Sequence, residues 1–238
     1  MLDLGTNEGR IISAALRLAA ERPWNEISLR DIAEAAGMNL AGLSDTYHSK
    51  SEVLAGFVKQ VDREVLANAP APQPGESQRD ALFEVIMARF DVLAPYKSAL
   101  NSIVKSGETE LPMLRTLLSS QAWMLQAAGI DSDGPAGGLR TAGLASVYAS
   151  VLRTWLEDDD PGLARTMAAL DRKLRRGESM MSVLDDTLKA ATVQKNRQAL
   201  LLSALIIYYL KQNGYMVQPF VKRLKQAELL QNGGGENA

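Results

Sequence analysis

The stretch SLRDIAEAAGMNLAGLSDTYHSK, residues 28–50, decides the fold of the N-terminal part of this chain. Ser28 begins a short helix predicted over residues 28–36, and Asp31 completes a capping box with it. Gly37 ends that helix, because a residue without a Cβ adopts the left-handed conformation at little cost. Asn39 caps a second short helix predicted over residues 40–47. Two short helices joined by a tight turn that contains glycine form a helix-turn-helix.

Helical periodicity continues on both sides of this stretch. Apolar residues share one face of a helix predicted over residues 7–22, and Pro23 ends it. Ser49 and Glu52 form another capping box, which opens a longer helix. The segment NAPAPQPGESQ, residues 68–78, then interrupts the pattern with three prolines and a glycine. We therefore predict a domain over residues 1–67, a linker over 68–78 and a larger domain over 79–231.

The larger domain also shows only helical spacing. We predict helices over residues 82–95, 96–105, 111–128, 139–157 and 163–176, with a glycine-rich connection at 129–138. Residues 199–210 are apolar nearly all round, so they are buried or covered by a partner. Residues 232–238 (NGGGENA) are expected to be a disordered tail. The expected fold class is all-α, with an N-terminal helix-turn-helix domain followed by a helical bundle for ligand binding and dimerisation.

Composition narrows the possible functions. The 238 residues carry a formal net charge of −2 and contain no cysteine, which excludes disulfides and thiolate chemistry. With His48 as the one histidine, a histidine metal site or a Ser-His-Asp triad is not expected, and we predict no catalytic residue, metal or cofactor. The longest apolar run has 12 residues, whereas spanning a bilayer takes roughly 20. Because no secretory pattern lies near the start, we expect a cytoplasmic protein. Because no set of residues makes a credible active site, we do not expect an enzyme.

The residues around the helix-turn-helix resemble the N-terminal domain of TetR-type transcriptional repressors. The resemblance covers about residues 9–66 and implies a DNA-binding domain whose second short helix lies in the major groove. The matching positions are Ile32, Ala33, Ala36, Gly37, Met38, Leu43, Tyr47, Ser49, Lys50 and Leu54.

This resemblance also implies a set of DNA contacts. They are Ser28 and Arg30 at the first short helix, Asn39, Leu40, Ala41, Gly42, Ser44 and Asp45 at the recognition helix, and Tyr47, His48 and Lys50 after it. The family commonly has a tyrosine where this chain has Ser44, and often a basic residue where it has Leu40 or Asp45. Residues 1–66 hold seven Lys/Arg and ten Asp/Glu, so 7 − 10 = −3. Because phosphate neutralisation supplies most non-specific DNA affinity, a helix-turn-helix kept only as a scaffold remains an alternative.

Aromatic and apolar residues in the second domain are candidates for a ligand pocket. Trp123, Tyr148, Leu152 and Trp155 could line an apolar cavity. Side chains of this kind at helical spacing also serve as ordinary core. Both interpretations stay open from the sequence.

A second resemblance concerns residues 110–176. The residues that carry it are Arg140, Leu144 and Tyr148, then Trp155-Leu156 with Asp158 to Pro161, then Thr166, Met167, Leu170 and Asp171. They are similar to the C-terminal region of lipid-binding accessory proteins of ubiquinone biosynthesis. That resemblance implies a lipid ligand, a non-DNA-binding scaffold and a peripheral membrane contact through a C-terminal amphipathic helix such as residues 217–230.

The sequence thus leads to two functional hypotheses. The first is a homodimeric TetR-type repressor that binds double-stranded operator DNA and is controlled by a small apolar ligand, with residues 139–157 and 163–176 as candidate dimer helices. The second is the lipid-binding accessory protein. Sequence names neither the operator nor the ligand.

Overall fold

A computed structural model describes residues 4–69, 75–107 and 111–193, with the backbone alone for residues 111–112 and 180–193. Within these residues the secondary structure is entirely helical, as the periodicity predicts. The described residues up to Arg175 form one compact unit, which ends within the last described helix. The apolar run 199–210, the amphipathic segment 217–230 and the tail 232–238 lie outside the described residues.

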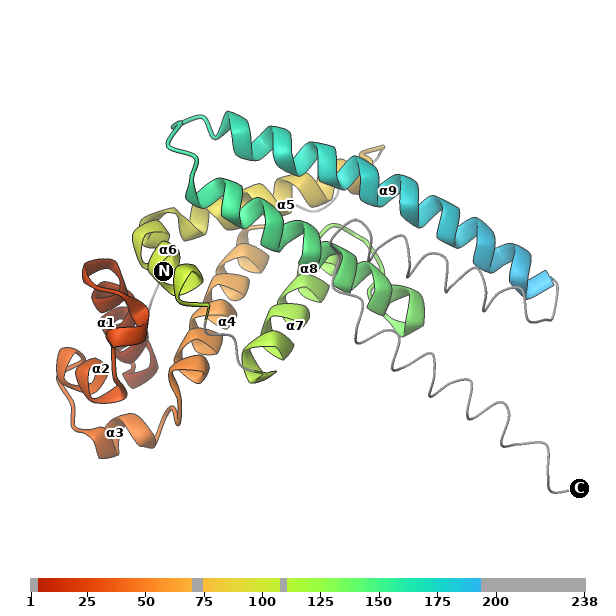
Figure 1. The fold of residues 1–238 in the computed structure, drawn as a ribbon. Helices are drawn as coiled ribbons and strands as arrows, with labels where there is room; N and C mark the ends of the chain where they lie inside the picture. The colour runs from red at the N-terminus through yellow and green to blue at the C-terminus, as the bar shows by residue number, and fades with distance from the viewer. Residues whose placement is uncertain (1–3, 70–74, 108–110, 194–238) are drawn as a thin grey trace, which may run out of the picture. The chain divides into compact units, whose positions relative to one another are not determined.

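Four helices make up the N-terminal part (Figure 1). α1 spans Asn7–Glu21, α2 Leu29–Ala35, α3 Leu40–Ser44 and α4 Lys50–Asn68, with a 3-10 turn η1 at Trp24–Glu26. The side chains of Ser28, Asn39 and Ser49 cap α2, α3 and α4 as predicted. The capping box predicted at Ser49 is only half formed, because the Glu52 carboxylate accepts from the His48 N–H and not from that of Ser49. α3 ends at Ser44, three residues earlier than the sequence predicts, and Asp45 is its C-cap.

The remaining described helices are α5 (Gln78–Leu93), η2 (Ala94–Tyr96), α6 (Lys97–Ser106), α7 (Leu111–Ala127), α8 (Gly134–Leu156) and α9 (Ala164–Val193). Three of their boundaries differ by more than two residues from the prediction. α5 begins at Gln78 and not at residue 82, because the Ser77 side chain caps it. α8 begins inside the expected glycine-rich connection, because Pro135 occupies its first turn, where a fixed φ and a missing N–H suit a helix. α9 continues past Gly177, because a single glycine weakens a helix but does not end it.

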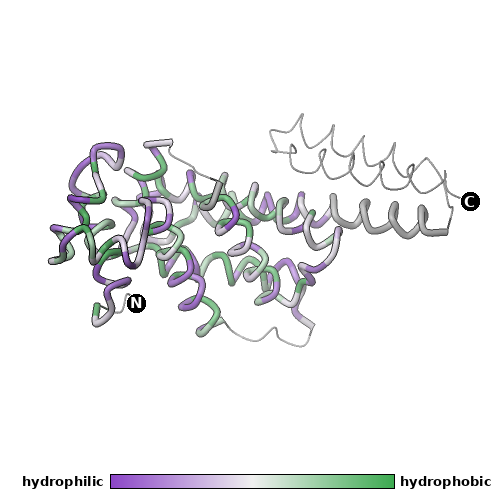
Figure 2. The backbone as a smooth tube through the Cα atoms, turned by 90° about the horizontal axis from the view of Figure 1, so that it is seen from below, coloured by the Kyte–Doolittle hydropathy of each residue, from purple (hydrophilic) through white to green (hydrophobic). Residues whose placement is uncertain are grey.

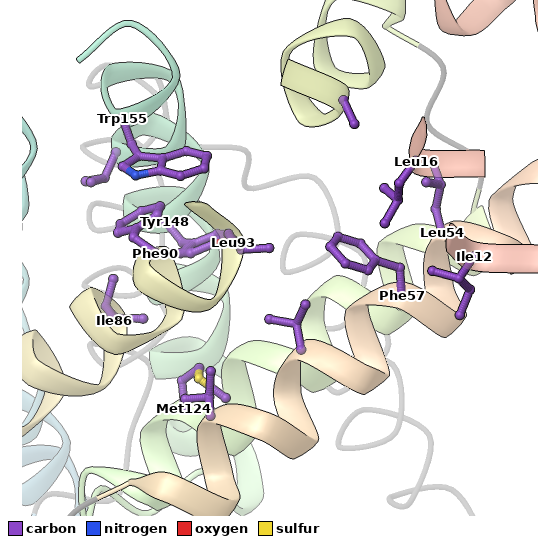
Figure 3. Close-up of a cluster of buried hydrophobic side chains, with 14 of the residues drawn as sticks. Ile12, Leu16, Leu54, Phe57, Ile86, Phe90, Leu93, Met124, Tyr148 and Trp155 are labelled. Atoms are coloured by element: carbon purple, nitrogen blue, oxygen red, sulfur yellow. The ribbon is translucent and has the colours of Figure 1, made fainter. Parts of the chain in front are cut away.

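The helices bury a continuous apolar core in residues 4–175. Hydrophobic and hydrophilic segments alternate along these helices, as amphipathic packing requires (Figure 2). At one end of the core Ile12 and Leu16 lie near Leu54 and Phe57 of α4 (Figure 3).

At the other end of the core, Phe90 stacks on two aromatic rings, Tyr148 at 5.5 Å and Trp155 at 5.3 Å between ring centroids. α4 therefore contributes to packing beside α1 as well as beside α7, and its buried face runs from Val53 to Val65. The domain boundary at residues 68–78 stays a prediction.

Candidate nucleic-acid interface

Local hydrogen bonds shape the helix-turn-helix. Ser28 and Asp31 form the predicted reciprocal capping box on α2. Gly37 has φ +71°, the left-handed conformation expected of it, and the next residue, Met38, donates its N–H to the Ala33 carbonyl at 3.0 Å. Asn39 Oδ1 accepts from the Gly42 N–H at 2.8 Å and begins α3. Each short helix thus begins at a side-chain cap, and the turn between them is fixed by the backbone.

Apolar contacts set which face of each helix points outward. Ile32 and Ala33 of α2 and Leu43 of α3 are buried in the core. With Leu43 inside, α3 leaves Leu40, Ala41, Ser44 and Asp45 exposed. Leu40 is one of the few large apolar side chains with considerable exposure, at 38%. The candidate reading residues of α3 therefore share its solvent face, with Asn39 exposed at its start.

Several polar groups on this face are already engaged locally. The Ser44 hydroxyl donates to the Ala41 carbonyl at 2.8 Å, and the side-chain Oδ1 of Asn39 accepts from the Gly42 N–H in the cap. The exposed Asp45 carboxylate and the Asn39 amide nitrogen carry the remaining hydrogen-bonding capacity of α3. An aspartate accepts from cytosine N4, and an asparagine amide donates to a base acceptor.

Residues predicted to touch phosphate differ in availability. Arg30 is exposed, and Ser28 is exposed but forms the α2 cap. The Lys50 amine instead donates to the Trp24 carbonyl at 3.1 Å and lies 4.9 Å from the centre of the Trp24 ring. Lys50 therefore ties the start of α4 to η1.

Two further predicted contacts follow α3. His48 is exposed, and its backbone N–H donates to Glu52 Oε2 at 2.7 Å. Tyr47 is half-buried, and its hydroxyl lies so close to α4 that a Cβ on Gly56 would be 2.2 Å from it. Burial, with a smaller contribution from the Glu8 carboxylate, raises the pKa of Tyr47 to about 12. Tyr47 therefore packs the segment after α3 against α4 at Gly56, where a side chain larger than that of glycine would require the Tyr47 ring to move.

Acidic groups on the domain are partly neutralised. Arg22 pairs with Asp31 at 3.1 Å. Hydrogen bonds from the Ser28 side chain and backbone, then from Arg22, lower the pKa of Asp31 to about 2. Arg17 donates to the Ala35 carbonyl at 3.0 Å and so holds α1 against the end of α2. Much of the domain's basic charge thus maintains the fold.

The four pocket candidates do not line one groove. Trp155 and Tyr148 are buried and stack on Phe90, and Leu152 is partly buried against the same core. Trp123 is 55% exposed and lines a groove between α4 and α7 whose other lining residues include none of the three. The assignment of these residues to a ligand stays a prediction.

A buried polar cluster was missed by sequence reasoning. Arg89 on α5 is 2% exposed; its Nη1 donates to the Asp62 carboxylate on α4, and its Nε donates to the Tyr148 hydroxyl on α8 at 3.1 Å. Ser120 on α7 donates to Asp62 at 2.7 Å. We call Asp62, Arg89, Ser120 and Tyr148 the Arg89 cluster. The available signal was a charged residue inside an apolar stripe on each of two helices, Asp62 and Arg89.

Asp158 is a second buried acidic residue, with 1% of its surface exposed. Its carboxylate accepts from the Thr166 N–H at 2.8 Å and from the Thr166 hydroxyl at 2.7 Å. These bonds, first that of the Thr166 hydroxyl, lower the pKa of Asp158. Asp158 therefore anchors the first turns of α9. Over the described ranges, no group of three or more His, Cys, Asp or Glu is placed to hold a metal ion.

The length and apolar character of the described helices bear on whether one could cross a membrane. Among the helices whose residues the structure describes, none combines the length and the apolar character needed to span a bilayer.

The comparison with protein families gives one match, the description "Bacterial regulatory proteins, tetR family", over residues 11–56. This range contains α1, α2, α3 and the start of α4. No curated protein matches the chain.

Solved structures with a similar fold include three TetR-family regulators. One from Rhodococcus sp. RHA1 has 20% identity and a TM-score of 0.58, covering 72% of this chain and 94% of its own. One from Nitrosomonas europaea ATCC 19718 has 20% identity and a TM-score of 0.56, covering 72% and 97%. One from Streptomyces coelicolor has 16% identity and a TM-score of 0.52, covering 87% and 97%. The protein therefore carries a TetR-family helix-turn-helix domain at residues 11–56, followed by a helical region with the fold of TetR-family transcriptional regulators.

Proposed function

We propose that this protein is a DNA-binding transcriptional regulator of the TetR type that acts as a repressor. The observation that carries the proposal is the state of α3: Asn39 caps it, Leu43 anchors it, and its remaining face is exposed within a TetR-family domain. A helix held in this way is suited to enter the major groove. The exposed residues Leu40, Ala41 and Asp45 then face base edges, and Arg30 faces the phosphates.

Few phosphate contacts are expected. Lys50 bonds to the Trp24 carbonyl, Arg22 pairs with Asp31, and Arg17 bonds to the Ala35 carbonyl. Among the predicted DNA contacts, Arg30 is therefore the basic residue that is exposed and able to meet a phosphate. The salt dependence of DNA affinity follows the number of neutralised phosphates. We therefore expect affinity to fall only gradually as salt is raised, and sequence readout by α3 to supply much of the specificity.

A homodimer would place two α3 helices about 34 Å apart, one per half-site. α8 and α9 are the proposed dimer helices. α9 exposes Met167 at 38% with Ala164 and Ala168 on its surface, and these small and flexible apolar residues support close helix packing. A small molecule bound outside α1–α3 would then change the spacing of the reading helices and so the bound population.

The experiment is gel retardation with fragments that flank the gene, across a range of salt. We expect a retarded complex at low salt, abolished or weakened at least about tenfold in Leu40→Asp, because a carboxylate at this position in the major groove is repelled by the negative charge of the DNA. Arg30→Gln should weaken binding to all DNA sequences alike, and it should reduce the slope of log affinity against log salt by about one. Lys105→Gln, which removes an exposed cation on α6 outside the proposed DNA and dimer surfaces, is the control. If no flanking fragment is retarded even at low salt, the regulator proposal is wrong.

The lipid-accessory alternative is not favoured by the family match or by the similar structures. Its test is mass spectrometry of the purified protein. A co-purified isoprenoid that disappears in Trp155→Ala would support it, and the cytoplasmic regulator predicts none.

A further inference from the structure

A groove of about 820 Å³ lies between α4 and α7, outside the helix-turn-helix. We call it the α4–α7 groove. Its lining combines basic, hydroxyl and apolar side chains. They are Lys59, Asp62, Arg63, Leu66, Ala67, Arg115, Thr116, Ser119 and Trp123.

The groove has two different ends. Residue numbers rise in the same direction along α4 and α7 (Figure 1), and Ser120 bonds to Asp62 halfway along them. Lys59 and Arg115 therefore lie toward one end, Leu66 and Trp123 lie toward the other, and Arg63 lies between them beside Asp62. With a rise of 1.5 Å per residue, Arg115 and Trp123 are separated by about 12 Å along the α7 axis. One end is cationic, and the other is apolar.

The cationic end is not compensated by nearby carboxylates. Lys59, Arg63 and Arg115 are exposed and form no ion pair with any residue that the structure describes. Lys59 and Arg63 are four residues apart on α4, a spacing at which like charges repel. The acidic residue of the lining, Asp62, is already neutralised by Arg89. An anion at this end would relieve repulsion among three positive charges in a chain of net charge −2.

The apolar end presents an indole to solvent. Trp123 is 55% exposed, whereas Trp24 and Trp155 are 1% exposed. Leu66, which lines the same groove, is only partly buried. An apolar chain lying along Leu66, Ala67 and Trp123 would remove this surface from water, which is favourable in proportion to the area covered.

We propose that the α4–α7 groove binds a single-chain amphipathic anion, with its carboxylate or phosphate head between Lys59, Arg63 and Arg115 and its apolar chain against Trp123. Because Asp62 lines the groove and belongs to the Arg89 cluster, the bound head lies beside the contacts that fix α4 to α5, α7 and α8. α4 continues directly from the helix-turn-helix, so a shift of α4 reaches α3. The regulatory part of this inference rests on the proposed DNA-binding function, while the binding part does not.

The binding test uses tryptophan fluorescence of the full chain with three probes of equal chain length: decanoate, decyltrimethylammonium and decanol. Below the micelle concentration, decanoate should shift the emission to shorter wavelength in a saturable way, because Trp123 leaves water. The cationic and neutral probes should bind at least about tenfold more weakly. Trp123→Phe should abolish the shift, while calorimetry still detects decanoate binding in that variant.

Charge variants test the head site. Lys59→Gln combined with Arg115→Gln should weaken decanoate at least about tenfold, and Lys105→Gln, an exposed lysine of α6, should leave it unchanged. Near-ultraviolet circular dichroism verifies that the double variant is folded. Equal binding of the three probes, or an unchanged affinity in the folded double variant, would overturn the proposal. A further outcome is that phosphatidylglycerol vesicles bind through Lys59 and Arg115 while decanoate does not bind. The ligand would then be a membrane lipid, and the proposal of a free single-chain ligand would be wrong.

Gel retardation with and without decanoate separates the two proposals. If decanoate binds and no DNA fragment is retarded, the groove is confirmed and the regulator proposal is wrong. If DNA is retarded but decanoate does not bind, only the groove proposal is wrong. If both occur, decanoate should change DNA affinity, and this change should disappear in the Lys59→Gln, Arg115→Gln double variant.

Discussion

The caps of α2 and α3 differ from the Arg89 cluster in how far apart their partners lie in the chain. In the caps, Ser28 bonds to Asp31 and Asn39 to Gly42, both three residues apart and exposed. In the cluster, Arg89 bonds across 27 residues to Asp62 and across 59 to Tyr148, in the interior. A lost exposed cap costs about 1 kcal/mol, whereas breaking a buried ion pair costs about 3–5 kcal/mol. The contacts that are easiest to recognise in the sequence are therefore the weaker ones.

The largest expected effect comes from removing the Asp62 carboxylate. Asp62→Ala leaves the Arg89 guanidinium buried without its counter-charge, which should lower the free energy of unfolding by about 3–5 kcal/mol. Urea denaturation measures this loss. Asp171→Ala removes an exposed pair with Arg175 on α9 and should cost about 0.3–0.5 kcal/mol.

A double replacement sharpens the same contrast. Asp62→Leu together with Arg89→Met should cost less than Asp62→Ala alone, because no buried charge remains unpaired. If Asp62→Ala lowers the free energy of unfolding no more than Asp171→Ala does, the Arg89 cluster contributes no more to stability than a surface ion pair.

Gly56 on α4, which lies against the Tyr47 ring, should give the next largest effect. In Gly56→Ala the new Cβ would lie 2.2 Å from the Tyr47 hydroxyl and 2.9 Å from Cζ, so the ring must move. Overpacking of this kind costs about 1–3 kcal/mol. The shift should also appear as a change in the alkaline titration of Tyr47, followed by ultraviolet absorbance.

Gly138→Ala is the matched control, because its Cβ would meet no atom within 4 Å. It should stabilise the protein slightly, since alanine is the better helix former. If both alanine variants change stability alike, Tyr47 does not pack tightly against α4.

Asn39→Ala tests the cap of α3 by itself. It should lower the free energy of unfolding by about 1 kcal/mol, because the Gly42 N–H loses its acceptor. Ser44→Ala, at the other end of the same helix, removes a hydroxyl bonded to the Ala41 carbonyl and should change stability by less than about 0.5 kcal/mol. Chemical denaturation compares the two, and an equal loss in both would contradict the cap assignment.

The smallest effect is a titration shift in the α2 cap. In Ser28→Ala the pKa of Asp31 should rise from about 2 toward its ordinary value of 3.8, because the Ser28 hydroxyl is the main cause of the lowering. Because the pKa of Asp31 is lower in the folded than in the unfolded protein, its carboxylate stabilises the folded state at pH values above 3.8. This stabilisation is lost as the pH falls from 3.8 to about 2. Carboxyl NMR titration measures the pKa, and Ser44→Ala should leave it unchanged.

Sequence patterns predicted the existence of the described helices well and some of their ends poorly. The caps at Ser28, Asn39 and Ser49 were identified because a side chain and the N–H it accepts from are three residues apart. The predicted start of α8 and the predicted end of α9 were wrong, because the glycines of residues 129–138 and Gly177 were treated as breaks. Residues 134–138 and Gly177 lie inside helices, since a glycine weakens a helix without ending it. The role of Lys50 was not predictable, because it depends on the Trp24 carbonyl 26 residues away.

By itself the sequence determined the all-helical fold class, the helix-turn-helix and the family of its N-terminal domain. The fold class and the helix-turn-helix follow from periodicity, capping residues and glycine, which act within a few residues of the chain. The family follows instead from the resemblance of about residues 9–66 to TetR-type domains. Only the tertiary structure decided that Tyr148 and Trp155 pack in the core, that Arg89 and Asp62 pair there, and that three cations and Trp123 share one groove. Such groupings require distant helices to pack side by side, and the spacing of residues along one helix does not specify which faces of two helices meet.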